Sequence, residues 1–201
     1  MVLNEPSINH HLKQQSKACG FTIIELITTL SIAGILAGVV IASFYQSYER
    51  ERLRAASRIL AGWLDEQRRA AIQNSSPCDV SIDISDTTAL SKCDSLGSTL
   101  VTFDLASELN DDKLVIENIS GGTCDPIWSF SPRGTVAQAE TTSSLYTAGV
   151  NCLPTTANLE LRLSLNGSNA SNRCIYLTYP LGVIKQARLT VSGTCDYTKV
   201  L

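Results

Sequence analysis

The chain has 201 residues, of which 44% are hydrophobic and 17% are charged, and its formal net charge at pH 7 is −3. This length suits one folded domain with an additional segment, because single domains usually contain about 100–150 residues. The slightly acidic balance argues against a general polyanion-binding protein.

Residues 1–16 are polar and unpatterned, and a run of apolar, small and hydroxyl-bearing residues extends from Phe21 to Phe44. A helical run of this length can cross the roughly 30 Å hydrocarbon core of a bilayer. Its one ionisable side chain is Glu25, and an acid inside a membrane is costly enough to indicate a function. We therefore expect residues 21–46 to form a transmembrane helix half.

The residues Gly20-Phe21-Thr22-Ile23-Ile24-Glu25-Leu26 resemble the class III signal of the type IV pilin superfamily. The resemblance implies that prepilin peptidase removes residues 1–20 by cleaving after Gly20. It implies that Phe21 becomes the N-methylated N-terminus and that Glu25 serves filament assembly. The implied partners are other pilins or pseudopilins along the N-terminal helix, the prepilin peptidase, an inner-membrane assembly platform and membrane lipid.

The charges that flank the apolar run do not fix its orientation. Lys13 and Lys17 precede the run, but Arg50, Arg52 and Arg54 follow it, and the positive-inside rule counts both ends. A secretory signal peptide is the alternative, but it fits poorly because its apolar region spans only about 7–15 residues. The processing signal implies a single-pass protein of the bacterial inner membrane, with a periplasmic head, that assembles into a pilus or pseudopilus.

Residues 47–76 are expected to continue the helix as an amphipathic half. The chain contains no Pro from Tyr45 to Asn74 and is rich in residues that favour helix. Pro77 should end the helix, because proline disfavours helical geometry at the residue before it. The predicted apolar face recurs at steps of three, four or seven residues and consists of Leu53, Ala56, Leu60, Trp63, Leu64 and Ala71.

Residues 77–201 change to a hydrophobic period of two, which predicts short antiparallel strands. A hairpin turn or short loop is expected at Asn166–Asn169, and the longest loop at Ala139–Pro154. The predicted fold class is α+β, with a long N-terminal α-helix packed on a β-rich globular head. The expected strands contain Val80-Ile82-Ile84, Leu100-Thr102, Leu114-Ile116, Ile127-Ser129, Leu159-Leu161-Leu163-Leu165, Ile175-Leu177 and Leu189-Val191.

The six cysteines beyond the apolar run are Cys78, Cys93, Cys124, Cys152, Cys174 and Cys195. An even set indicates disulfides in an oxidising compartment. Without Cys-x-x-Cys spacing or a histidine in this region, no metal or other cofactor is expected. Six cysteines allow 15 pairings, and closeness along the chain favours Cys78–Cys93 and Cys174–Cys195, leaving Cys124–Cys152.

Two stretches of the head are similar to the GspH/FimT-like minor pilins and pseudopilins, namely Trp128–Thr135 and Pro180–Lys185. This similarity implies a structural subunit that initiates, primes or tips a type IV pilus or a type II secretion pseudopilus. The alternative is a minor pilin that binds DNA or a surface, because some relatives bind DNA through arginines at the later glycine turn. Here Val183 follows Gly182, which leaves Arg133, Lys185 and Arg188 as candidate ligand or DNA contacts.

Catalysis is not expected. No histidine follows Gly20, and the cysteines are expected in disulfides, so Ser-His and Cys-His arrangements lack essential members. The paired carboxylates Asp111-Asp112 lie in a segment that is typical of a turn.

Overall fold

The computed structural model describes residues 20–94, 99–110, 113–120, 122–152, 158–165, 172–190 and 194–197. The chain divides into two compact units, Met1–Ser43 and Phe44–Leu201. The leader before Gly20, the turn expected at Asn166–Asn169 and the strand residue Val191 lie outside the described residues.

Helix α1 (Ile23–Gln73) contains residues of both units. In the first unit, the large apolar side chains of α1 from Ile23 to Leu36 are exposed, and Ile23, for example, is 80% exposed. Among the described residues, no helix is both long enough and apolar enough to cross a membrane. The transmembrane half expected over residues 21–46 stays a prediction.

In the second unit, the predicted apolar face of α1 is confirmed, because all six of its residues are buried. The helix ends at Gln73 in a hydrogen-bonded cap. Ser75 has a positive φ of 51°, its N–H donates to Ile72 O, and the Ser76 N–H donates to Ala71 O, both at 3.3 Å. This is the Schellman pattern, so the chain leaves the helix before it reaches Pro77.

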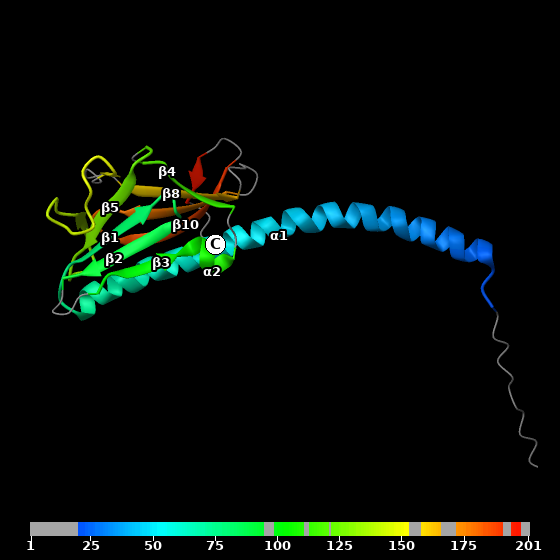
Figure 1. The fold of residues 1–201 in the computed structure, drawn as a ribbon, viewed down its shortest axis with the longest axis horizontal. Coiled ribbons are helices and arrows are strands. Elements are labelled where there is room, and N and C mark those ends of the chain that lie inside the picture. The colour runs from blue at the N-terminus through cyan, green and yellow to red at the C-terminus, as the bar shows by residue number, and fades with distance from the viewer. Residues whose placement is uncertain are drawn as a thin grey trace, which may run out of the picture. The chain divides into compact units, whose positions relative to one another are not determined.

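Two sheets form the rest of the head (Figure 1). The first has the order β3-β2-β1-β5-β6, with the short strand β7 beside β5, and the second has the order β11-β10-β9-β8-β4. The first sheet contains β1 (Cys78–Asp83), β2 (Thr88–Cys93), β3 (Val101–Asp104), β5 (Asp125–Phe130), β6 (Val136–Gln138) and β7 (Asn151–Cys152). The second contains β4 (Leu114–Asn118), β8 (Leu159–Leu165), β9 (Arg173–Thr178), β10 (Val183–Leu189) and β11 (Cys195–Asp196).

The expected α+β fold is confirmed, with one exception in strand direction. The strands pair antiparallel except for β5 and β7, which are parallel. A short helix, α2 (Leu105–Leu109), lies beside α1 (Figure 1). Arg52 Nη2 donates to the Leu109 carbonyl at 2.8 Å, so a cation of α1 meets the negative end of α2, which favours cations.

Several expectations about strands were wrong or incomplete, and β7 lies within Ala139–Pro154, the stretch expected to be the longest loop. Ile84 lies in a turn rather than in β1, because the Asp83 carboxylate accepts the backbone N–H groups of Ser85 and Asp86 at 2.9 and 3.1 Å. This local bonding turns the chain. Strand β2 was missed, since its sequence TALSKC has little β-branched or aromatic content. Most of β10 was missed because its beginning was interpreted as part of a turn.

One hydrophobic cluster contains residues of α1 and of both sheets, including Leu64, Trp128 and Ile175. A polar pair is buried beside it, where Ser91 Oγ donates to Gln67 Oε1 at 2.8 Å. The bond satisfies both groups, whose burial without partners would cost about 1–3 kcal/mol. The amphipathic part of α1 is therefore an integral part of the head's core.

Candidate functional site

The residues around the expected cleavage point lie before the first turn of α1. Gly20, Phe21 and Thr22 are non-helical and exposed, and Phe21 is 79% exposed. A Cβ added at Gly20 would meet none of the described atoms within 4 Å. The Gly20–Phe21 peptide bond thus lies in an open segment of the kind that proteases reach.

Thr22 caps the helix immediately after this bond. Its Oγ1 accepts the Glu25 backbone N–H at 3.3 Å, and its carbonyl accepts the Leu26 N–H at 3.1 Å. Thr22-x-x-Glu25 is the sequence pattern of a capping box, so the start of this helix has a local signal in the sequence. The cap fixes the start of the helix, so Glu25 lies in its first turn, where a negative charge is favoured by the helix dipole.

Apolar side chains surround Glu25 on the surface of this turn. Phe21, Ile24 and Leu26 are each more than half exposed, and Glu25 is exposed as well. An apolar surface that carries a single acid can bury against another apolar surface, provided that the partner supplies a positive charge or donors for the carboxylate. This arrangement suits assembly with a second helix.

The two glycine turns that resemble the GspH/FimT-like group pack against each other in the head. The Val136 N–H donates to Pro180 O at 2.7 Å. Gly134 and Gly182 have φ values of 76° and 68°, and a Cβ added at Gly182 would collide with the Gly134 carbonyl oxygen. The two turns therefore form one unit that joins β5–β6 of the first sheet to β9–β10 of the second.

We expect Gly182→Ala to lower the free energy of unfolding by about 2–4 kcal/mol, because it adds both a disfavoured φ and this collision. Urea unfolding of the full chain in detergent, followed by tryptophan fluorescence, would measure it, since both tryptophans, Trp63 and Trp128, are buried in the head. Gly62→Ala is the matched control. It lies exposed in α1 with open space around it, so it should be neutral or stabilising. Equal effects of the two substitutions would contradict the close approach.

The candidate contacts Arg133, Lys185 and Arg188 are exposed but do not share one surface. Arg133 lies in the turn between β5 and β6. On β10, Lys185 is opposite Tyr176 and Arg188 is opposite Arg173. Because alternate residues of a strand point to opposite faces, Lys185 and Arg188 leave β10 on different sides.

The six head cysteines form three disulfides among the described residues, Cys78–Cys93, Cys124–Cys152 and Cys174–Cys195. These are the pairs that closeness along the chain favours. The first joins residues that face each other across β1 and β2. The second ties the parallel strand β7 to the chain just before β5, and the third joins β9 to β11.

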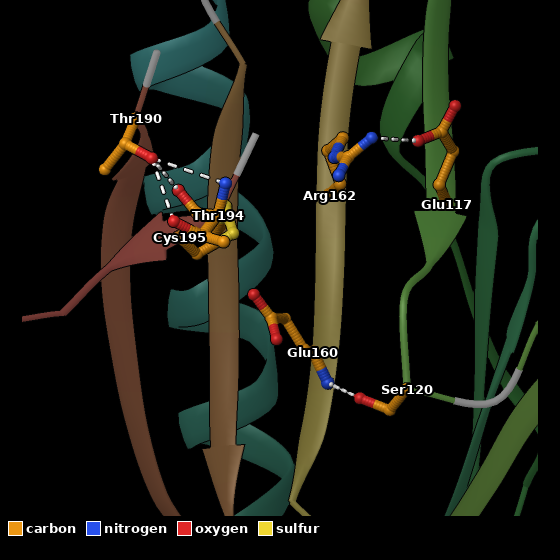
Figure 2. Close-up of a disulfide and its surroundings, with 8 residues drawn as sticks. Glu117, Ser120, Glu160, Arg162, Thr190, Thr194 and Cys195 are labelled. Carbon is orange, nitrogen blue, oxygen red and sulfur yellow. Dashed lines mark hydrogen bonds and ion pairs between the residues drawn. A yellow bond between two sulfur atoms is a disulfide. The ribbon is translucent and has the colours of Figure 1, made fainter. Parts of the chain in front are cut away.

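Glu160 extends toward the disulfide of Cys195 (Figure 2), and its carboxylate lies within 4.8 Å of the sulfur atoms of Cys174 and Cys195. A zinc site of this composition would need thiolate ligands, and a disulfide offers none. Nearby, the Thr194 N–H donates to Thr190 Oγ1 at 3.3 Å and the Thr190 hydroxyl donates to Thr194 O at 2.8 Å. The disulfide and these hydrogen bonds therefore hold β11 in place beside β10. Glu160 and the two disulfide-bonded cysteines do not form a metal site.

A comparison with protein-family models supports the interpretation of the N-terminal segment. Residues 15–41 match the family model described as the prokaryotic N-terminal methylation motif, which confirms the expected prepilin-like N-terminus. Among solved structures, the chain is similar to the type IV minor pilin FimU of Pseudomonas aeruginosa, with 15% identity and a TM-score of 0.47 over 74% of this chain and 95% of that chain. No curated protein matches the chain.

Proposed function

We propose that this chain, which carries the prokaryotic N-terminal methylation motif of prepilins at residues 15–41, is a minor pilin or minor pseudopilin. In this proposal it is a non-enzymatic structural subunit that initiates, primes or tips a type IV pilus or a type II secretion pseudopilus. The observation that carries the proposal is the motif itself. Its residues 20–22 are an exposed, non-helical segment directly before a capped helix, and the first turn of that helix contains Glu25.

The exposed first half of α1 supports assembly through this helix. From Ile23 to Leu36 its large apolar side chains are more than half exposed, and such a surface needs an apolar partner. We propose that the inner membrane covers it before assembly and that neighbouring pilin helices cover it afterwards, with the head in the periplasm. The opposite directions of Lys185 and Arg188 on β10 favour this assembly role over DNA capture by the head.

The first prediction of this proposal concerns processing. When the full chain is expressed with a prepilin peptidase, the mature protein should begin at Phe21 and carry one methyl group on its amine. Intact-mass spectrometry of the membrane fraction would detect both changes. A Gly20→Leu variant is the control, because a bulky side chain at the cut should block cleavage while leaving the head unchanged. Retention of residues 1–20 by the unmodified chain would contradict the proposal.

A further inference from the structure

A pocket of about 440 Å³ lies in the head between α1 and the strands β9 and β10. Four of its lining residues are arginines, namely Arg50, Arg54, Arg173 and Arg188, and its one acid is Glu51. Glu51 is already paired, since its Oε2 lies 3.0 Å from Arg54 Nη1. The formal charge of the lining is therefore +3, on a chain whose net charge is −3.

Arg173 is the buried centre of this cluster. Arg173 is only 4% exposed. Its Nη1 atom is buried without a hydrogen-bond partner among the described residues. Arg54 Nε is likewise buried, and no described residue forms a hydrogen bond with it. Leaving a buried charged donor unsatisfied is unfavourable, so both groups require an acceptor that the described protein atoms do not supply.

Strand register adds a second unfavourable feature. Arg173 on β9 is directly opposite Arg188 on β10, and like charges in that position repel each other. Asp196 of β11 is opposite Arg188 on its other side, but it does not line the pocket. Burial, together with the charges of Arg188 and Arg54, lowers the pKa of Arg173 to about 10. At neutral pH the guanidinium group of Arg173 therefore remains charged.

We propose that this arginine pocket binds a phosphate-type anion. Guanidinium groups donate fixed pairs of hydrogen bonds that fit phosphate oxygens, and a tetrahedral anion offers acceptors to several arginines at once. Its negative charge would also offset the repulsion between Arg173 and Arg188. A phosphate of this kind belongs either to a small soluble molecule or to the headgroup of an anionic lipid, and both share this chemistry. The proposal does not depend on the proposed pilin function.

The test uses the full chain in non-ionic detergent micelles. Isothermal titration calorimetry with inorganic phosphate is compared with sodium chloride at matched ionic strength, and a second arm adds short-chain phosphatidylglycerol to the same micelles. The test variants are Arg188→Gln and Arg50→Gln, whose side chains are exposed, so folding should survive both. The control is Lys185→Gln, which removes the same charge from the opposite face of β10.

We expect phosphate to bind, and each test variant to weaken binding about tenfold, as expected for the loss of one charge-assisted hydrogen bond. Lys185→Gln should bind as tightly as the unmodified chain. Tighter binding of phosphatidylglycerol than of phosphate, with the same sensitivity to Arg188→Gln, would identify a lipid headgroup as the source, and the reverse order a soluble phosphate. Absence of phosphate and lipid binding, or equal weakening by Lys185→Gln, would overturn the proposal.

Discussion

Glu25→Ala should leave membrane insertion, cleavage after Gly20 and the disulfides of the head intact, while it abolishes incorporation of the chain into filaments. The expected loss is large because Glu25 is the one acid of the apolar part of α1, and it lies among exposed apolar side chains. Cleavage would create a positive amine on Phe21, four residues and about one helical turn away.

The physical reason is the cost of an unpaired charge in an apolar bundle. Between neighbouring subunits, the carboxylate of Glu25 would meet the amine of the adjacent chain. Such a pair adds little net stability, but removing one partner leaves an uncompensated charge that costs roughly 3–5 kcal/mol. In the proposed filament, the pair would therefore set the axial register of the subunits more than the strength of their association.

The test measures the amount of the chain in the membrane fraction and in the sheared-filament fraction, for the variants and the unmodified chain at matched expression. Glu25→Gln keeps the size of the side chain and removes its charge, so it should fail like Glu25→Ala, whereas Glu25→Asp, one methylene shorter, should be partly impaired. The control Glu66→Ala removes an exposed acid from the head half of α1 and should assemble normally. Equal incorporation of Glu25→Ala and the unmodified chain would refute the assembly role.

The features that could be predicted from the sequence are those that depend on residues lying close together along the chain. The apolar face of α1 repeats at helical spacing, so Leu53, Leu60 and Leu64 could be assigned to the core. Disulfide partners are 15 to 28 residues apart, and the register of β1 and β2 brings Cys78 opposite Cys93. In both cases short segments carry the information.

The features that could not be predicted depend on contacts between distant segments. The turns at Gly134 and Gly182 each have turn chemistry, but nothing in either stretch shows that their backbones touch. Arg173 is a clearer case, because an arginine at the start of a strand normally predicts an exposed side chain. Its burial follows from the pairing of β9 with β10 and from the packing of α1, which no local pattern contains.

Replacing Cys78 and Cys93 together by Ala should lower the free energy of unfolding by about 4 kcal/mol. The chain-entropy estimate for a loop of 15 residues is about 3 kcal/mol. Removing the buried sulfur of Cys78, which is fully buried in the core, should add about 1 kcal/mol. Urea unfolding of the oxidised full chain in detergent, followed by tryptophan fluorescence, would measure the loss.

The matched control is the Cys124→Ala and Cys152→Ala pair, which separates the two contributions. This disulfide closes a loop of 28 residues. If chain entropy alone determined its effect, it would contribute about 0.5 kcal/mol more than the first disulfide to the free energy of unfolding. Its cysteines are only partly buried, however, so little packing is lost with them. We therefore expect the Cys78 and Cys93 pair to be the more damaging of the two. The reverse order would show that loop length, and not the position of Cys78 in the core, governs the stability that these disulfides give to the head.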